Sequence, residues 1–300
     1  MRVLNIFDLG SFVHAGAYNT HAYIDEEPIV GADGYRACHI PCGGIALVLK
    51  TIRENGDKAT YVFAGDRNPT IKKGMYPDYK GQREHKRSIE IQKELTEFIL
   101  KDCGFMVLAE EGYEADDIIY SLVKKYKGAY DHINVFTGDS DLYFLVDKNV
   151  SIKKSSSRAK DVDMSNYEQA TKKRIPYNLI PFSKIVNGDT SDNIPSLSRE
   201  TKNKIQPVPD DPDVRAAYGE KATLEALGGF YGQEFLDRVN LIYPLTVMVP
   251  DELIERGDFR RMQQWGKTIR CSAFGSPYSA VPETLRASVD EIIARGLYED

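Results

Sequence analysis

Short apolar runs alternate with longer segments of helical periodicity along the first half of this chain. The runs are rich in Val, Ile and Phe and lack a clean alternation, which is typical of strands buried on both faces. They lie at Val3–Phe7, Thr60–Ala64, Phe105–Leu108 and Ile133–Thr137, with a further one near Val150–Lys153. Helical patterns lie between them at Gly44–Arg53, Lys86–Asp102 and Ala115–Lys125. This order predicts an α/β fold with a mostly parallel central sheet and helices on both faces.

Acidic residues recur where these apolar runs end. In a parallel sheet, ligands gather at the carboxyl ends of the strands. Three further carboxylates open a predicted helix, where backbone N–H groups favour anionic side chains. The strand-end residues are Asp8, Asp66, Asp139 and Asp141, the helix-start residues are Glu114, Asp116 and Asp117, and two more acids follow at Asp189 and Asp192.

Clustered carboxylates of this kind repel one another and resist desolvation. A fold tolerates them when divalent cations neutralise the cluster, and oxygen ligands select Mg²⁺ or Mn²⁺ rather than zinc. The pattern therefore predicts a two-metal phosphoryl-transfer enzyme, and a nuclease above all. For Asp189 and Asp192 an alternative interpretation is that each caps a turn.

The formal net charge of −6 argues at first against a nucleic-acid partner. Its distribution reverses that argument, because two stretches are basic. Ile71 to Lys93 holds seven Lys and Arg against three Asp and Glu, and Lys148 to Arg174 holds eight against three. Basic stretches beside an acidic pocket suit a polyanion that is held by its backbone and cut at a metal site.

The four cysteines predict no zinc site. Cys38 and Cys42 flank His39, but no partner pair with matching spacing follows, because Cys103 and Cys271 are isolated. Reduced thiols fit a cytoplasmic protein of a bacterium or of a phage-infected host cell. No apolar run is long enough for a transmembrane helix and no signal-peptide pattern is present, so no membrane partner is expected.

Four motifs in order resemble the 5′-nuclease family, which comprises flap endonucleases, phage 5′-exonucleases and the 5′→3′ exonuclease domain of bacterial DNA polymerase I. The resemblance covers roughly residues 1–250 and implies a PIN-like sheet. The motifs are Tyr79–Arg83, Gly112–Asp117, Thr137–Asp141 and Gly188–Pro195.

The resemblance implies two Mg²⁺ ions, for which Mn²⁺ can substitute. One would be held mainly by Asp8, Asp66, Glu114 and Asp116, with Asp117 as a further candidate ligand of the same helix start. The other would be held by Asp139, Asp141, Asp189 and Asp192, with Asp116 as the shared carboxylate.

The resemblance also implies a helical arch over about residues 70–100 that surrounds the 5′ strand. Lys80 and Arg83 match the family's basic pair over the scissile phosphate. Tyr79 would stack on a base. The arch would further contribute Lys72, Lys73, Lys86 and Arg87.

After residue 187 helical segments, Pro-rich stretches and Gly clusters dominate, so we expect a nuclease domain over residues 1–180 and a helical subdomain over 181–300. The family carries a helix–hairpin–helix-type element here, which grips duplex DNA. Its Gly-rich run is displaced to Gly219–Leu224, with Gly219 and Lys221 as DNA contacts. Either Ser198–Arg215 is an insertion within the hairpin, or the hairpin is degenerate; both interpretations put a K⁺ ion there in doubt.

The function that the resemblance implies is a 5′→3′ exonuclease or flap endonuclease that leaves 5′-phosphates. Its substrate would be branched, nicked or duplex DNA with a 5′ end, or an RNA–DNA hybrid during primer removal in replication. A 300-residue chain without a polymerase domain looks like a free-standing, monomeric, phage-type enzyme. Two alternatives stay open: an RNA-cutting relative of the same fold, and a non-catalytic DNA-structure-binding protein.

Overall fold

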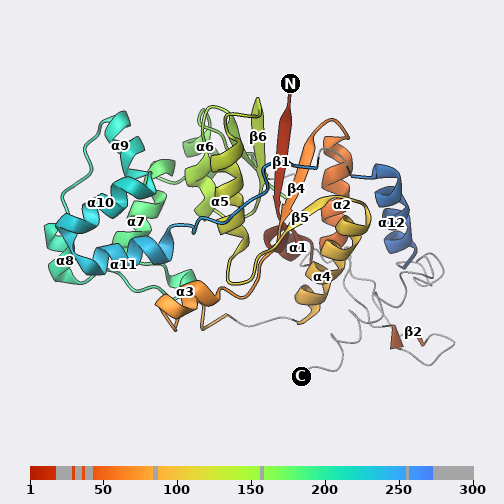
Figure 1. Cartoon of the computed structure of the whole chain (residues 1–300), viewed down its shortest axis with the longest axis horizontal. Coiled ribbons are helices and arrows are strands. Elements are labelled where there is room, and N and C mark those ends of the chain that lie inside the picture. The colour runs from red at the N-terminus through yellow and green to blue at the C-terminus, as the bar shows by residue number, and fades with distance from the viewer. Residues whose placement is uncertain are drawn as a thin grey trace.

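A five-stranded parallel sheet forms the centre of the computed structural model, with strand order β5-β4-β1-β6-β7 (Figure 1). The structure describes residues 1–17, 29–30, 36–37, 43–83, 87–155, 159–254 and 257–272. The predicted parallel sheet is confirmed, and each strand begins and ends within one residue of its prediction. The strands are β1 Val3–Asp8, β4 Thr60–Ala64, β5 Met106–Leu108, β6 His132–Phe136 and β7 Val150–Lys153; β2 Ile29–Val30 and β3 Arg36–Ala37 pair separately.

The predicted helices at 44–53, 86–102 and 115–125 are confirmed as α2, α4 and α5. None of the helices in the described ranges is long and apolar enough to cross a membrane. The α-helices are α1 Leu9–Ala17, α2 Gly43–Asn55, α3 Thr70–Met75, α4 Arg87–Asp102, α5 Ala115–Tyr126, α6 Tyr167–Thr171, α7 Ile180–Asn187, α8 Arg199–Lys204, α9 Pro212–Tyr218, α10 Lys221–Tyr231, α11 Gln233–Ile242 and α12 Phe259–Ser272. Short 3₁₀ turns are η2 Asp141–Leu145, η3 Tyr177–Leu179 and η4 Thr190–Asp192.

The two faces of the sheet carry separate apolar cores. Alternate residues of β1 serve each face: Leu4 and Ile6 point to the core under α5, whereas Phe7 points to the core under α1, α2, α4 and α12. Phe7 stacks on Phe136 of the neighbouring strand, with ring centroids 4.2 Å apart. Both faces are thus covered, which explains why the strands read as continuous apolar runs.

The strand order places β1 in the middle, with β4 on one side and β6 on the other. From β1 the chain adds β4 and then β5 on one side of the sheet, and it later adds β6 and β7 on the other side. The direction in which strands are added thus reverses at β1. Ligands of open parallel sheets bind outside the carboxyl ends at such a reversal. The end of β1 and the loops after β4 and β6 bring Asp8, Asp66 and Asp139 to this edge.

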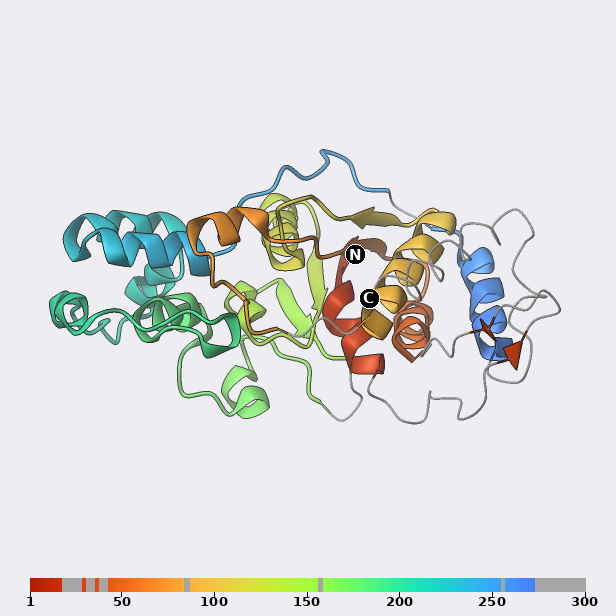
Figure 2. The same cartoon turned by 90° about the horizontal axis from the view of Figure 1, so that it is seen from below.

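Helices α7 to α11 form a helical subdomain beside the sheet, on the side of β7 and η2 (Figure 1). Residues 243–254, here called the strap, then run back along the outside of α5 (Figure 2). Leu245 N donates to Asp117 Oδ1 (2.7 Å) and Val247 N donates to Ser121 Oγ (2.9 Å). The strap leads to α12, which packs on α2 and α4 at the far end of the molecule.

Candidate active site

Asp8 ends β1, and the helix α1 begins at the next residue. Its carboxylate is 6% exposed. Oδ1 accepts a hydrogen bond from Ser11 N (2.9 Å), and Oδ2 accepts one from Thr137 Oγ1 (2.7 Å). The Thr137 hydroxyl also accepts from Asp139 N (2.9 Å). One side chain of the loop after β6 therefore positions two of the expected acids.

Asp66 lies two residues after β4 and is held from two sides. Ala115 N donates to its Oδ1 (3.0 Å), and Lys93 Nζ lies 3.3 Å from its Oδ2. A Cβ atom added at Gly10 would lie 2.4 Å from Asp66 Oδ2. A glycine at position 10 is therefore what lets the carboxyl ends of β1 and β4 approach this closely.

Four acids from four separate segments share one electrostatic environment. Burial, and after it the charges of Asp66 and Asp139, raises the pKa of Asp8 to about 7. Burial also raises the pKa of Asp116 well above its ordinary value, and Asp139 and Asp8 add to that shift. Carboxylates that disfavour each other's ionisation lie close together. The convergence predicted from the strand ends is thus present.

Two ammonium groups and a phenol hydroxyl converge on Glu114. It is the N-cap residue of α5. Lys72 Nζ and Tyr79 Oη each donate to its Oε2 at 2.8 Å, and Lys80 Nζ donates to its Oε1. Burial raises the pKa of Glu114, but the charges of Lys72 and then Lys80 outweigh burial and lower the pKa to about 2.

Two of the residues expected to contact DNA are buried instead. Lys72 is 4% exposed and Tyr79 is 2% exposed. Lys72 bridges Glu114 and Asp117, and its Nζ lies 5.7 Å from the centre of the Tyr79 ring. The predicted base stacking by Tyr79 and the predicted DNA contact by Lys72 are therefore wrong, because both side chains are used to join α3 to the start of α5.

The carboxylate of Asp117 is turned into the protein rather than toward the other acids. It is fully buried and closes the capping box of α5 by accepting from Glu114 N (3.0 Å). It also accepts from Leu245 N in the strap and pairs with Lys72 at 3.2 Å. We expected Asp117 among the metal ligands, but these structural partners occupy its oxygens, so we leave it out of the proposed ligand set.

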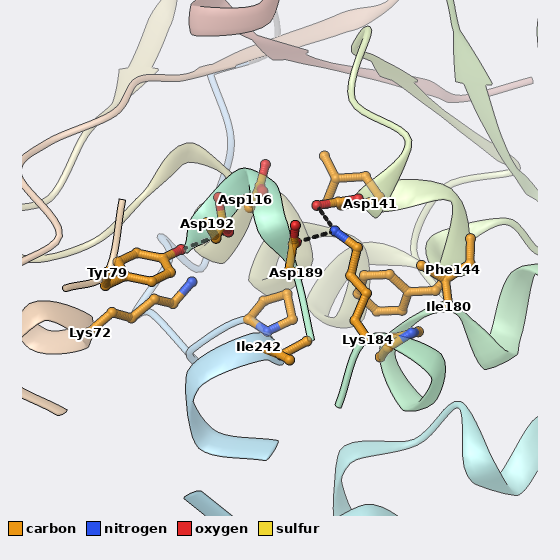
Figure 3. Close-up of a pocket in the computed structure, with 13 residues that line it drawn as sticks. Lys72, Tyr79, Asp116, Asp141, Phe144, Ile180, Lys184, Asp189, Asp192 and Ile242 are labelled. Atoms are coloured by element: carbon orange, nitrogen blue, oxygen red, sulfur yellow. Dashed lines mark hydrogen bonds and ion pairs between the residues drawn. The ribbon is translucent and has the colours of Figure 1, made fainter. Parts of the chain in front are cut away.

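A second acidic group lies beside the first, where η2 meets the helical subdomain. Figure 3 shows Lys184 of α7 reaching between Asp141 and Asp189, and its Nζ donates to both carboxylates. Burial and the charge of Asp139 raise the pKa of Asp141. Asp189 also caps η4 by accepting from Ser191 N (2.9 Å), so the expected capping role is confirmed. We did not predict Lys184 from the sequence.

Asp192 joins this acidic group to the basic motif at 79–83. Arg83 Nη2 donates to its Oδ1 (2.7 Å), and Tyr79 Oη donates to its Oδ2 (3.3 Å). Burial raises the pKa of Asp192. Backbone contacts reinforce the junction, because Lys80 N donates to Asp192 O (3.0 Å) and Asn193 Nδ2 donates to Asp78 O (2.9 Å). The guanidinium of Arg83 stays half exposed, so a phosphate can reach it.

The other expected DNA contacts lie away from the acids or outside the described residues. Lys73 bonds Asn68 Oδ1 (2.9 Å) on the outer side of α3. Gly219 is the C-cap residue that follows α9, and Lys221 begins α10, so helices flank this Gly-Glu turn. The 198–215 segment contains α8 and the first part of α9. Lys86, Cys38 and Cys42 lie outside the described residues, and so does the side chain of Arg87.

The acids pair with ammonium groups as they stand. In the ranges that the structure describes, no three His, Cys, Asp or Glu side chains are arranged to hold a metal ion. Lys93, Lys80 and Lys184 contact the carboxylates instead. The chemistry of the donor set nevertheless fits a hard divalent cation, since every donor is a carboxylate oxygen. Burial, and after it the charges of neighbouring acids, raises the pKa of Asp8 and of Asp116, and a bound cation would offset both causes.

Comparison with known proteins agrees with the family resemblance of the sequence motifs. A model of the 5′-3′ exonuclease N-terminal, resolvase-like domain matches residues 13–174, which is 162 of the 300 residues. The chain belongs to this exonuclease family. The predicted resemblance is thus confirmed for the part of the chain that holds all of the expected acids except Asp8, Asp189 and Asp192.

The curated relatives of this chain are longer than the segments that match it. The chain is 31% identical over 159 residues to DNA polymerase I of Caldicellulosiruptor bescii, and this match covers 52% of this chain and 19% of that protein. It is 26% identical over 205 residues to a 5′-3′ exonuclease of Aquifex aeolicus, which covers 66% of this chain and 65% of that one. The chain thus spans about a fifth of the polymerase and about two thirds of the exonuclease.

Solved structures confirm the flap endonuclease-like fold. The flap endonuclease of bacteriophage T5, in a complex with DNA and metal ions, aligns with a TM-score of 0.52 and 16% identity over 98% of this chain and 99% of that one. The T5 protein crystallised with metal ions aligns with a TM-score of 0.53 and 17% identity over 98% of this chain and 100% of that one. At this identity the likeness concerns the fold.

Proposed function

We propose that this protein is a metal-dependent 5′-nuclease that hydrolyses phosphodiester bonds of DNA at 5′ ends or 5′ flaps. The observation that carries the proposal is the convergence of Asp8, Asp66, Asp116 and Asp139 from four segments at the carboxyl edge of the sheet. Membership of the 5′-3′ exonuclease family supports it.

Two groups of carboxylates would hold the ions, for which we propose Mg²⁺ with Mn²⁺ as a substitute. Asp8, Asp66, Asp116 and Asp139 form the first group, and Asp141, Asp189 and Asp192 form the second. Apart from Asp117, this grouping differs from the expected one in two residues. Glu114 is left out because Lys72, Tyr79 and Lys80 bond its oxygens, and Asp139 joins the first group because Thr137 holds it beside Asp8. Bound divalent cations supply an activated water and stabilise the negative charge on the leaving oxygen. No histidine or cysteine nucleophile is required.

The remaining side chains bind and position the substrate. Arg83 presents a half-exposed guanidinium that can grip a phosphate with two hydrogen bonds, and Lys80 lies beside it as a point charge. Lys80 already contacts Glu114 and Asp192, so a phosphate would compete with these two carboxylates for its ammonium group. Lys184 plays the corresponding part for Asp141 and Asp189.

Cleavage of labelled DNA tests the proposal. Flap, nicked and blunt duplex substrates carrying a 5′ label are incubated with Mg²⁺, Mn²⁺ or EDTA. We expect wild-type protein to release a short oligonucleotide or mononucleotides, EDTA to abolish release, and Asp139→Asn to lower the rate by at least about 10³-fold. Asp57→Asn is the control, because this exposed carboxylate lies before β4 at the opposite edge of the sheet.

The products separate the remaining alternatives. Short oligonucleotides identify a flap endonuclease, and mononucleotides identify a 5′-exonuclease with the same site. If wild-type protein cuts only RNA, the DNA substrate is wrong. If it binds all three DNA substrates and cuts none, the catalytic proposal fails and a DNA-structure-binding protein remains.

A further inference from the structure

Two lysines share one tyrosine ring on the β7 side of the carboxylates. Lys154 Nζ lies 4.4 Å from the centre of the Tyr143 ring, and Lys173 Nζ lies 5.4 Å from the same centre. Tyr143 is 7% exposed and packs edge-to-face on Tyr167, so the ring is a fixed platform. Two ammonium groups are therefore brought together at one place.

Neither ammonium group has a carboxylate partner in the part of the chain that the structure describes. The hydrogen bond of Lys154 Nζ goes to the carbonyl oxygen of Gly138, at 3.3 Å. Burial lowers the pKa of Lys154 to about 8; Asp139 acts against this shift, and Lys173 adds to it. Two half-buried like charges with no carboxylate in ion-pair contact repel each other and are poorly solvated. An anion bound between them would offset both costs.

The backbone around Lys154 is braced, so the side chain is directed rather than free. Asp161 accepts from Lys154 N (3.1 Å) and from Lys153 Nζ (2.9 Å). Ile152 and Val162 pair across the same turn. This bracing places the ammonium group of Lys154 beside Gly138, the residue before Asp139.

Contacts through the acids separate this pair of lysines from the Lys80 and Arg83 pair. Lys154 Nζ bonds the carbonyl oxygen of Gly138, next to Asp139, whereas Lys80 and Arg83 contact Asp192. Between these two places, Lys184 joins Asp141 to Asp189. A DNA strand held at both places would pass these carboxylates.

We propose that Lys154 and Lys173 form a second phosphate-binding site, which holds a backbone phosphodiester of the DNA on the β7 side of the carboxylates. This inference rests on the proposed nuclease function, and it adds a substrate contact that the 79–83 motif does not provide. The ligand chemistry is a phosphate, which is either an internal phosphodiester or the terminal 5′-phosphate.

The test compares Lys154→Met, Lys173→Met and the double variant with Lys58→Met. Methionine keeps the apolar stem over Tyr143 and removes the charge. Lys58 is exposed and precedes β4 at the opposite edge of the sheet. Lys58→Met therefore removes the same charge at a place away from the site. Binding of a nicked duplex is measured by fluorescence anisotropy in EDTA over a range of salt concentrations, and cleavage is measured with Mg²⁺.

We expect each site variant to bind DNA on the order of tenfold more weakly and to raise KM with little change in kcat. The slope of log K against log salt should fall by about 1 for each lysine removed. Lys154→Arg should restore binding, because it restores the charge. Lys173→Glu should weaken binding further than Lys173→Met and serves as a second variant if the double variant does not fold.

Substrates with a 5′-phosphate and with a 5′-hydroxyl identify the source of the phosphate. An equal loss on both substrates indicates an internal phosphodiester, and a loss confined to the 5′-phosphate substrate indicates the terminal group. Folded variants that bind and cleave like Lys58→Met would overturn the second site. Wild-type protein that binds DNA through these lysines but does not cleave it would overturn the proposed function and leave the binding site intact.

Discussion

At the scale of single residues, burial and the charges of neighbouring acids oppose the ionisation of the carboxyl groups of Asp8 and Asp116. Asp8 is the clearest case, because its two hydrogen bonds orient the carboxylate while burial and the charge of Asp66 raise its pKa to about 7. The folded protein therefore binds a proton at Asp8 more tightly than the unfolded chain does.

This shift predicts a specific pH dependence of stability in the metal-free protein. Since the folded pKa is about 7 and the ordinary value is 3.8, the unfolding free energy should fall as pH rises between these values. Asp8→Asn should flatten that slope and raise the unfolding free energy at pH 8 by about 1–3 kcal/mol. Urea unfolding at a series of pH values from about 4 to about 8 measures both the slope with pH and the difference between the two proteins at pH 8.

Addition of Mg²⁺ provides the control for this prediction. A cation that binds the folded state should stabilise the wild-type protein at pH 8 and stabilise Asp8→Asn much less. Equal slopes for the two metal-free proteins would contradict the assignment of the pH dependence to Asp8.

At the scale of elements, the helix α3 is fastened to the helix that presents the acids. Lys72 of α3 lies between Glu114 and Asp117 at the start of α5, and Asp117 is bonded in turn to the strap. Three segments distant in sequence thus meet at one buried ammonium group. Removing it leaves two buried carboxylates with fewer partners.

We predict that Lys72→Met lowers the unfolding free energy by about 3–5 kcal/mol, because it breaks a buried ion pair from one side. Lys72→Arg should recover part of that loss. Lys73→Met is the matched control, since Lys73 belongs to the same helix and its ammonium group donates to Asn68 Oδ1 in an exposed hydrogen bond. Chemical denaturation of the three variants decides; equal stability of the two Met variants would exclude the proposed anchoring role.

The turn that carries Asp189 depends on Gly188. Its φ is +77°, and a Cβ atom there would lie 2.5 Å from the carbonyl oxygen of Ile194. We predict that Gly188→Ala lowers the unfolding free energy by more than about 2 kcal/mol and slows cleavage by displacing Asp189. Gly104→Ala isolates the backbone effect, since Gly104 has a φ of +73° and open space around it. Thermal unfolding that gives the same loss for both variants would show that crowding at Gly188 is unimportant.

At the scale of the whole molecule, the chain returns from the helical subdomain to the opposite end of the sheet. There Asp102 accepts hydrogen bonds from Arg261 Nη2 (2.6 Å) and from Trp265 Nε1 (2.8 Å), which dock α12 on α4. Burial raises the pKa of Asp102, but the hydrogen bonds from Arg261 and then Trp265 outweigh burial and hold it below its ordinary value. The docking contact should therefore persist above about pH 4 and weaken below it.

We predict that Asp102→Asn loosens α12 without disabling the site. The unfolding free energy should fall by about 1–2 kcal/mol, and the fluorescence of Trp265, which is 6% exposed and the single tryptophan, should shift to longer wavelength. Cleavage should stay within about twofold of wild type, because α12 packs on α2 and α4 rather than on the acids. Asp57→Asn is the control; loss of cleavage in Asp102→Asn alone would show that α12 supports the site.

The sequence predicts the place of a residue where that place follows from the order of the strands, and does not predict it where it follows from packing between distant segments. Asp8, Asp66 and Asp139 could be placed because parallel strands share a carboxyl edge. Lys184 could not, because its role follows from how α7 packs on η2, which no local pattern reveals. Tyr79 was misjudged for a related reason: the motif shows the basic residues beside it but not that the ring is enclosed.

The backbone of Lys80 has a consequence for how this position can vary. Its φ is 54°, a left-handed conformation that glycine or asparagine adopts with the least strain. Its ammonium group, however, contacts Glu114 and Asp192, and a neutral side chain would leave both without that charge. Glycine or asparagine would thus suit the backbone conformation at position 80, but neither supplies the positive charge that Glu114 and Asp192 contact. A complete substitution scan at this position should find no neutral replacement: glycine should relieve the backbone strain but lose both ion pairs and the activity, and arginine should keep activity while retaining the strain.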